Sequence, residues 1–326
     1  MKIGLQVPST TFNGGDSSTL FDTLVSVAQT AESNGFDTFA LMDHFFQLPH
    51  VGPIDDPMLE CYTALGAVAA RTTSIKVSAL VTGVTYRNPA LLAKAVTTLD
   101  VVSRGRAICA IGAAWFEAEH QALGFSFPPL KERFEKLEEA IQICRLMFDH
   151  KQSSFRGEHF EIIDAYNVPR PVQGHIPIMV GGQGEKKTFK FAAKYADHLN
   201  TTANHDDIPA KMAALQEHLD DVGRSRSDIE VSCHCPMVIG ENTADVQARL
   251  VHVLAARGMD TSLAATPEKV RLMLGRALIG TPDEIASQID GLRAMGMNGV
   301  TVSLIGGVDD LENLALAGRT ISAAFN

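Results

Sequence analysis

Short apolar runs alternate along this chain with longer amphipathic segments. The apolar runs predict strands near residues 3–7, 37–42, 75–81, 106–111, 177–180, 197–200, 229–235 and 299–305. The run RAICAIG at 106–112 is almost wholly apolar, as is typical of a parallel strand that helices cover on both faces. Between the runs, apolar residues recur at helical spacing, as in Leu92, Val96 and Leu99.

Local signals mark the ends of several predicted helices. A helix at 20–33 is expected to end before Gly35, which suits the C′ position. Asp56-Pro57 predicts the start of a helix that runs to Arg71, and Asn88-Pro89 the start of the next. Thr281-Pro282-Asp283-Glu284 is a capping box that opens a helix to residue 295. Other helices are predicted at 131–148, 185–195, 208–222, 243–257, 267–276 and 310–324.

Eight strand-helix units predict an α/β fold. They favour a (β/α)8 TIM barrel over an open doubly wound sheet. Extra residues at 115–130, 150–176 and 240–281 are expected as insertions at the C-terminal face of the barrel. No Ser/Gly-rich linker and no break in composition divides the chain, so we expect one domain over residues 1–326.

The composition narrows the classes of partner. The chain has 38 Asp and Glu residues against 28 Lys and Arg, and its net charge is -10. With no basic block, this balance argues against nucleic acid or an anionic membrane as a partner. We see neither a signal-peptide pattern in MKIGLQVPS nor an apolar stretch long enough to span a membrane. The five cysteines lie mostly in apolar runs, which fits reduced thiols, so we expect a cytoplasmic protein.

The stretch FALMDHF at 39–45 places Asp43 and His44 directly after the second predicted strand. In a TIM barrel, chemistry takes place at the C-terminal ends of the strands. A carboxylate beside an imidazole can fix its tautomer or hold its proton, as general acid-base catalysis requires. Alternatively, Asp43 caps the following turn beside a structural histidine. The dipeptide alone leaves both interpretations open.

A glycine-rich stretch follows the fifth predicted strand, with Lys186 and Lys187 in the first turn of the next helix. Its residues are Val180, Gly181, Gly182, Gln183 and Gly184. Glycines permit close backbone approach, and a helix N-terminus with two cations favours a phosphate. The alternative is a tight turn with solvated lysines. We expect phosphate, although the common barrel phosphate site follows strands 7 and 8.

Small residues also follow the fourth strand, in Gly112-Ala113-Ala114-Trp115. They would leave room for a flat ligand against which the single Trp could pack, unless that Trp belongs to the core. The pair Glu117 and His120 is too small a set for a metal site. Cys233-His234-Cys235 lacks further ligands nearby in sequence, so we expect these cysteines in the core and no metal.

Four segments together resemble the bacterial luciferase-like superfamily of flavin monooxygenases and oxidoreductases, and within it the branch that uses coenzyme F420. The segments are FALMDHF, SALVTGVTYRNPALLAKAVTTLDVVSRGR, AIGAAWFEAEHQALGFSFPPLKERFEKLEEAIQI and PRPVQGHIPIMVGGQGEKKTFKFAAKYADHLN. Their order and spacing are those of the family, from the N-terminus to about residue 201. The C-terminal third is less distinctive.

The resemblance implies roles for particular residues. His44 matches the family histidine near the redox end of the flavin-like ring, and Asp43 its neighbouring acid. The cofactor is expected to contact Ala79-Leu80-Val81, where relatives carry a bulge with a non-prolyl cis peptide, and the adjoining Thr82. Gly112 to Trp115 are expected beside the tricycle. Gly181 to Gly184 are expected beside the phosphate. Trp115 aligns with a catalytic Glu of several relatives, including sugar-phosphate dehydrogenases. That acid is therefore absent or replaced, for which Glu117 is the candidate.

From this resemblance we expect an oxidoreductase that exchanges a hydride between coenzyme F420 and a small organic substrate. A proton must move with the hydride, and we expect His44 to handle it while Asp43 holds His44 in register. One alternative is an FMN-dependent monooxygenase of the same fold. Another is a non-catalytic flavin-binding barrel. The resemblance also implies a homodimer.

Overall fold

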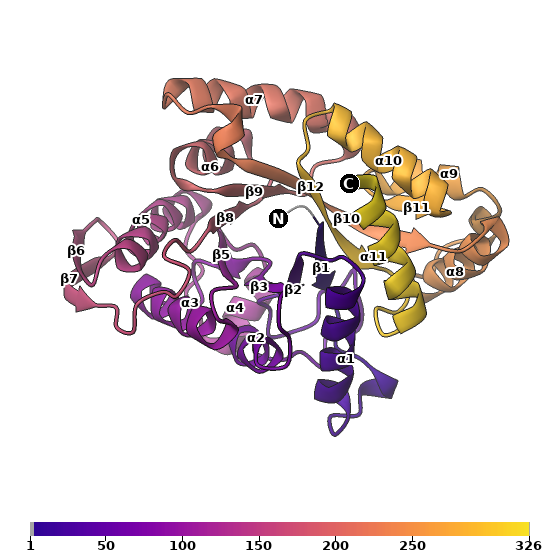
Figure 1. The fold of residues 1–326 in the computed structure, drawn as a ribbon, viewed down its shortest axis with the longest axis horizontal. Helices are drawn as coiled ribbons and strands as arrows, with labels where there is room; N and C mark the ends of the chain where they lie inside the picture. Colours follow the sequence, from indigo (N-terminus) through magenta and orange to yellow (C-terminus); the bar gives the residue numbers. More distant parts are fainter. Residues whose placement is uncertain (1–2, 326) are drawn as a thin grey trace.

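The computed structural model describes residues 3–325, and its main sheet closes into a parallel barrel (Figure 1). Neighbouring strands follow the order β12-β1-β2-β3-β5-β8-β9-β10, and β10 pairs with both β9 and β12, which closes the ring. The barrel strands in the described residues are β1 (Ile3–Val7), β2 (Thr38–Leu41), β3 (Lys76–Ala79), β5 (Ala107–Gly112), β8 (Ile178–Gly181), β9 (His198–Thr201), β10 (Glu230–Ile239) and β12 (Gly299–Leu304). The predicted TIM barrel is confirmed.

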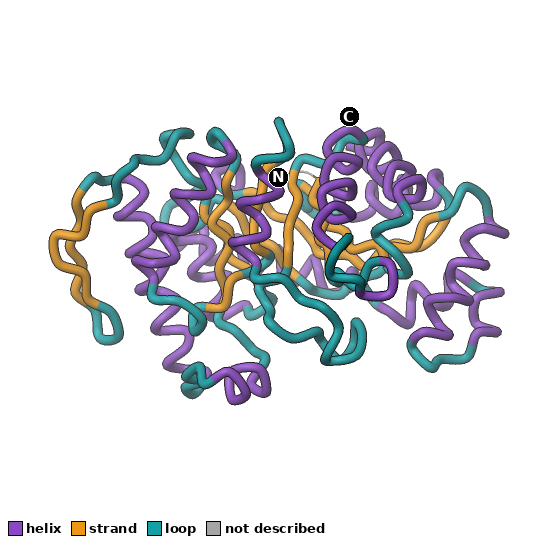
Figure 2. Tube along the Cα trace, turned by 90° about the horizontal axis from the view of Figure 1, so that it is seen from below, coloured by secondary structure: helices purple, strands orange, loops and turns teal. Residues whose placement is uncertain are grey.

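Four shorter strands were not predicted. β4 (Thr82–Gly83) pairs with β5, and β11 (Leu278–Gly280) pairs with the extended end of β10. β6 (Gln152–Arg156) and β7 (Glu161–Tyr166) form a separate antiparallel hairpin that projects from one side of the barrel (Figures 1 and 2). The hairpin belongs to the expected insertion at 150–176. It connects the end of α5 to the start of β8, so the expectation that this insertion lies at the C-terminal face is wrong.

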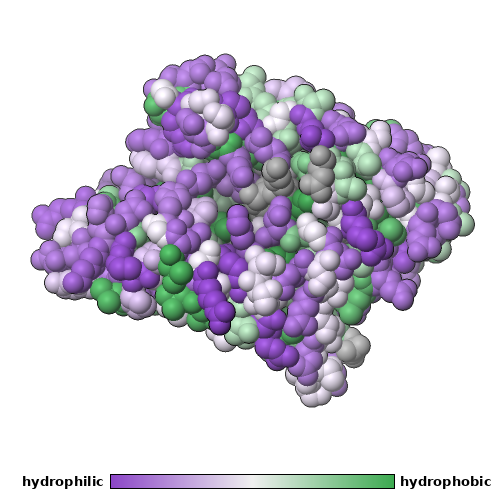
Figure 3. All heavy atoms as spheres, viewed as in Figure 1, coloured by the Kyte–Doolittle hydropathy of each residue, from purple (hydrophilic) through white to green (hydrophobic). Residues whose placement is uncertain are grey.

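Helices surround the strands, as Figure 2 shows from a second direction. They are α1 (Leu20–Ser33), α2 (Cys61–Ala69), α3 (Pro89–Ser103), α4 (Glu117–Leu123), α5 (Leu130–Asp149), α6 (Lys190–Tyr195), α7 (Ile208–Asp221), α8 (Thr243–Ala256), α9 (Pro267–Leu274), α10 (Pro282–Ala294) and α11 (Leu311–Phe325). None in the described part of the chain is long and apolar enough to cross a membrane. The face in Figure 3 is mostly hydrophilic, with small separate apolar patches.

Most of the predicted helix ends are confirmed. Asn88 caps α3 by accepting a hydrogen bond from the backbone N–H of Ala90, and Thr281 and Glu284 form the capping box of α10. Gly35 has a φ of 95° after α1, where a glycine avoids strain. The prediction at Asp56-Pro57 is wrong, because α2 begins at Cys61. Its N-cap is Glu60, whose carboxylate accepts from the Thr63 N–H.

The inside of the barrel carries a polar layer rather than apolar packing alone. Ser232 Oγ lies 2.7 Å from His198 Nε2 and 2.7 Å from Asn200 Nδ2, and Asn200 also donates to Thr301 at 3.2 Å. All four side chains are buried. Burial lowers the pKa of His198 to about 3, so this imidazole is neutral at ordinary pH. The layer lies on the inward-facing positions of β9, β10 and β12.

Candidate functional site

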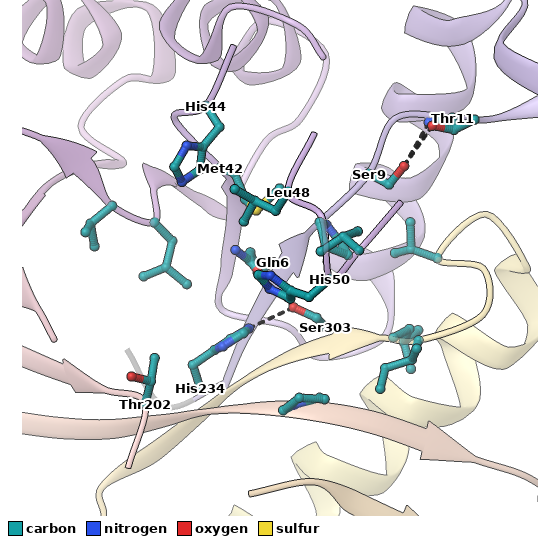
Figure 4. Close-up of a pocket in the computed structure, with 18 of the residues that line it drawn as sticks. Gln6, Ser9, Thr11, Met42, His44, Leu48, His50, Thr202, His234 and Ser303 are labelled. Atoms are coloured by element: carbon teal, nitrogen blue, oxygen red, sulfur yellow. Dashed lines mark hydrogen bonds between the residues drawn. The ribbon is translucent and has the colours of Figure 1, made fainter. Parts of the chain in front are cut away.

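A cavity of about 620 Å³ opens at the C-terminal ends of the barrel strands (Figure 4). Every barrel strand or the loop that follows it contributes to the lining. In strand order these contributions include Gln6, Met42, Thr82, Ala114, Gly181, Asn200, His234 and Ser303. The cavity therefore lies where active sites of TIM barrels are found, and its size suits a small-molecule ligand.

His44 lines this cavity and is held by Glu119, a residue of α4. His44 Nδ1 lies 3.0 Å from Glu119 Oε2, and the carboxylate is fully buried. An ionised carboxylate only accepts hydrogen bonds, so Nδ1 carries the proton and Nε2 remains available to a ligand. Trp115 and Phe116 pack edge-on against the imidazole at centroid distances of 5.7 and 5.9 Å.

Glu119 is fixed by several donors at once. Its Oε1 accepts the backbone N–H groups of Phe45 and Phe46, at 2.5 and 2.8 Å, and its Oε2 accepts the Tyr86 hydroxyl. Burial alone would raise the pKa of Glu119, but the hydrogen bonds from His44, Tyr86 and Phe46 lower it below its ordinary value. The carboxylate is therefore ionised and rigid beneath His44.

Asp43 does not hold His44, which corrects the expectation from the sequence. Its carboxylate is buried and makes a bidentate pair with Arg87, at 2.5 and 3.0 Å. Burial raises the pKa of Asp43, and the Arg87 charge opposes that rise. Arg87 also contacts Glu60 at 2.6 Å, the N-cap of α2. Asp43 thus connects the end of β2 to Arg87, before α3, and through Arg87 to Glu60, before α2.

Leu80 and Val81, the residues after β3, form a ledge in the wall of the cavity. The Leu80–Val81 peptide bond is cis, as predicted, and both residues line the cavity beside Thr82. A Cβ at Gly112 would lie 2.9 Å from a Val81 methyl carbon, and one at Gly181 would lie 2.7 Å from another. Glycine is thus needed on both sides of Val81 for the ledge to seat against β5 and β8. A second cis bond, Val168–Pro169, is distant from this ledge in sequence.

The other predicted binding residues divide into two groups. Ala114, Trp115, Gly181 and Gly182 line the cavity, and Trp115 is 57% exposed, which excludes the alternative of a core Trp. Six predicted residues do not line the cavity. Ala79 and Val180 are buried, Gly112 lies behind Val81, and Ala113 packs against the main core. Gln183 and Gly184 are exposed. Lys186 and Lys187 are also exposed, on a π-helical turn at Glu185–Phe189.

A row of polar side chains forms another wall of the cavity. His234 Nε2 lies 2.8 Å from Ser303 Oγ, and Ser303 donates in turn to Gln6 Oε1 (Figure 4). Burial, with smaller contributions from Arg276 and His50, lowers the pKa of His234 to about 3. His234 is therefore neutral, and the row offers hydrogen-bonding groups rather than charge to a ligand.

Positive charge enters the cavity from the C-terminal third of the chain. Arg257 and Arg276 both line it, together with the imidazoles of His50 and His252 and one carboxylate, Asp309. Among the described contacts, Arg276 donates to the Thr202 carbonyl at 3.1 Å, and no carboxylate pairs with either guanidinium. Partial desolvation lowers the pKa of Arg257, which is otherwise an exposed residue. Two arginines facing one cavity without a carboxylate partner favour an anionic group on a ligand.

Neither Glu117 nor His120 acts at the cavity. Glu117 is exposed, accepts from Gln121 and does not line the cavity, so it does not lie where the expected acid would act. His120 is buried, with Nδ1 against the Phe116 carbonyl at 2.7 Å and Nε2 against Thr85 Oγ1 at 2.6 Å. Both of its nitrogens are used, so this histidine is structural.

Glu119 is one of the cavity-side residues that the sequence analysis missed, together with Arg257 and Arg276. Phe116, Glu119 and His120 are spaced i, i+3 and i+4, which places them on one face if the segment is helical. α4 was not predicted, however, because it is only seven residues long and four of those are charged or polar. With the helix recognised, an acid on its apolar face would have indicated a buried functional carboxylate.

Comparison with known proteins identifies one family and several relatives of the chain. A family model described as "Luciferase-like monooxygenase" matches residues 1–299. An F420-dependent glucose-6-phosphate dehydrogenase of Kineococcus radiotolerans is 32% identical over 226 residues, which is 68% of this chain and 65% of that enzyme. The match therefore spans slightly less than two thirds of the relative.

Solved structures agree on the fold at lower identity. A coenzyme F420-dependent tetrahydromethanopterin reductase from Methanopyrus kandleri superposes with a TM-score of 0.77 and 21% identity over 100% of both chains. The oxygenating component of 3,6-diketocamphane monooxygenase from Pseudomonas putida, solved with FMN, gives 0.74 and 16% over 99% and 98% of the chains. At these identities the superpositions support the architecture alone.

Proposed function

The chain belongs to the luciferase-like monooxygenase family of oxidoreductases, and from this premise we propose that it exchanges a hydride between coenzyme F420 and a small organic substrate. The observation that carries the proposal is the His44–Glu119 pair, which presents one imidazole nitrogen to a cavity beside the Leu80–Val81 ledge. A non-catalytic binding barrel would have no need of a buried carboxylate directed at that imidazole.

The residues present fit a flat, phosphate-bearing cofactor. Leu80, Val81 and Trp115 supply apolar surface to the cavity beside Thr82, whose hydroxyl is bonded to Tyr62, and Gly181 and Gly182 leave the backbone open beside them. Gly182 has a φ of 140°, and a Cβ there would lie 3.3 Å from Thr188, so the turn requires glycine. We expect the ring against the ledge and the phosphate towards the glycine turn. When bound, the deazaflavin supplies hydride donation and acceptance.

The protein itself contributes His44 as the proton carrier and Glu119 as the group that positions it. Glu119 fixes the Nδ1–H tautomer of His44 and stabilises the imidazolium that forms when Nε2 takes up a proton. In the direction of substrate oxidation, Nε2 accepts the proton of a substrate hydroxyl. In the direction of reduction it returns that proton to the carbonyl oxygen. Met42, Leu48 and Trp115 around the cavity limit the water that competes for this proton.

The arginine-bearing wall favours a substrate class. Arg257 and Arg276 line the same cavity as His44, so one small molecule can contact an arginine and His44 at the same time. A charge-assisted contact to a carboxylate or phosphate is worth about 1.5–3 kcal/mol when it is partly desolvated. We therefore expect a substrate with a hydroxyl or carbonyl at its reacting end and an anionic group at the other.

Turnover with and without oxygen tests this function. The purified protein with reduced coenzyme F420 is offered a panel of carbonyl compounds, half of which carry a carboxylate or phosphate, and re-oxidation of the coenzyme is followed optically. We expect stoichiometric reduction of one panel member, unaffected by removal of oxygen. Oxygen consumption that accompanies turnover with FMN, and no reaction with F420, would instead identify an FMN-dependent monooxygenase.

A further inference from the structure

A second group of side chains with metal-binding chemistry lies outside the cavity lining. Cys233 and Cys235 alternate with His234 along β10, so they face the side of the strand opposite the cavity. Both are fully buried and carry free thiols. The turn after β9 brings His205, 28 residues earlier than Cys233, against them. The sequence could not show this third member, because the fold alone joins the two segments.

The spacing of the three side chains suits a tetrahedral ion. Cys235 Sγ lies 3.5 Å from His205 Nε2, and the three potential ligand atoms all lie within 4.8 Å of one another. With Zn–S near 2.3 Å and Zn–N near 2.0–2.1 Å, tetrahedral geometry separates a sulfur from a nitrogen by about 3.5 Å and two sulfurs by about 3.8 Å. The side chains are thus close to the spacing that a bound ion requires.

We propose that Cys233, Cys235 and His205 bind one zinc ion. Two thiolates and an imidazole are a ligand set that zinc accepts, and three protein ligands leave the fourth position for water or another small ligand. His205 is half-buried whereas both cysteines are fully buried, so the ion enters from the side of the histidine. The site is independent of the cofactor and of the function proposed for the cavity.

The proposed ion fixes a part of the cavity wall from behind. His205 belongs to the turn that also holds Thr202, and its backbone N–H donates to the Gly275 carbonyl at 2.9 Å. The next residue, Arg276, donates back to the Thr202 carbonyl. A zinc ion therefore joins this turn directly to β10, and the two hydrogen bonds extend the connection to Arg276, which lines the cavity as Thr202 does. The ion strengthens a connection between distant parts of the chain.

Cobalt titration of the whole chain tests the site. The tag-free protein is reduced, treated with chelator, freed of the chelator and titrated with Co²⁺ in the absence of oxygen. We expect one Co²⁺ per chain with a thiolate-to-cobalt charge-transfer band in the near ultraviolet, which one equivalent of Zn²⁺ then abolishes. Zinc should also raise the midpoint of thermal unfolding. No charge-transfer band in the wild-type protein would overturn the proposal.

Variants identify the ligands. The His205→Ala protein should lose stoichiometric binding and the zinc-dependent rise in midpoint, and as a half-buried position it should tolerate the change. The Cys233→Ala and Cys235→Ala proteins should lose most of the charge-transfer intensity. Cys144→Ala removes a buried thiol outside the cluster and should bind as the wild type does. A band of undiminished intensity in either His205→Ala or Cys235→Ala would contradict the assignment.

Discussion

The carboxylate of Glu119 is the most constrained group near the cavity, since it accepts from an imidazole, a phenol and two backbone N–H groups. Burial and the neighbouring Glu119 charge raise the pKa of Tyr86, so the phenol remains a donor to that carboxylate. This arrangement leaves His44 Nε2 as the group that meets a ligand. Replacing His44 and replacing Glu119 should therefore have different effects on the reaction.

Replacement of His44 should remove turnover while binding persists. His44→Ala is expected to lose about 100-fold or more in kcat, the usual loss when a general acid-base group is removed. Cofactor affinity should change little, because the ledge and the glycine turn are untouched. Single-turnover kinetics and equilibrium binding are the measurements, with His218→Ala, outside the cavity, as the control. Unchanged kcat with a good substrate would assign His44 a structural role.

Replacement of Glu119 should shift the pH dependence of the reaction. Glu119→Gln keeps the shape of the side chain but removes the charge that stabilises the His44 imidazolium. The limb of the pH–rate profile that reports this imidazole should move to lower pH, and kcat should fall by about tenfold or more. Glu117→Gln, two residues away and exposed, is the matched control. Identical profiles for wild type and Glu119→Gln would refute the coupling.

The two arginines should determine substrate binding rather than the chemical step. Arg276→Ala is expected to raise KM for an anionic substrate by about 10- to 100-fold, which corresponds to one charge-assisted contact. The KM of a neutral analogue should change little. Arg293→Ala, where the guanidinium pairs with Asp290 outside the cavity, serves as the control. Equal effects on charged and neutral substrates would argue against an anion site.

At the scale of elements, the sequence predicted best where hydrophobic pattern and capping chemistry agreed. The barrel strands were found because their apolar runs are short and continuous, and α3 and α10 because Asn88 and Thr281 cap them as expected. The predicted start of α2 was wrong because Asp56-Pro57 has the sequence pattern of an N-cap and first helical residue, whereas the N-cap is Glu60. The hairpin of β6 and β7 was missed because most of its residues are exposed and lack a core-facing pattern.

One partly exposed contact between elements should make stability depend on pH. Near the end of α1, Glu32 accepts the N–H groups of Thr73, Ser74 and Ile75 in the loop before β3. Burial opposes but does not outweigh these hydrogen bonds, which lower the pKa of Glu32 from 4.5 to about 2. Because the folded-state pKa is the lower one, this stability is fully present above the ordinary pKa and is lost as the pH falls towards 2.

Glu32→Gln should therefore lower the free energy of unfolding at pH 7 by about 1–2 kcal/mol, after allowance for solvent screening at this partly exposed position. The difference from wild type should shrink as the pH falls from about 4.5 towards 2. Chemical denaturation across this range measures it, with the exposed Glu217→Gln as the control. A difference that stays constant with pH would show that the Glu32 charge contributes nothing.

At the scale of the whole molecule, the closed barrel determines which predictions from sequence could succeed. His44 and the glycine turn were predicted because each follows its own strand, and the barrel brings all strand ends to one face. The Leu80–Val81 segment was predicted from the family resemblance alone. The partner of His44 was predicted wrongly because Asp43 is adjacent in sequence, whereas Glu119 is 75 residues away. Arg257 and Arg276 come from the C-terminal third, where no local motif distinguished them.

The choice of cofactor is the central claim, and equilibrium binding tests it most directly. Purified protein is titrated separately with coenzyme F420 and with FMN at moderate salt, and binding is followed by fluorescence. The two share a tricycle and a ribityl phosphate, so the cavity alone does not separate them. We predict that F420 binds clearly more tightly and turns over without consuming oxygen. FMN binding of equal or greater affinity, with oxygen consumed during turnover, would contradict this account.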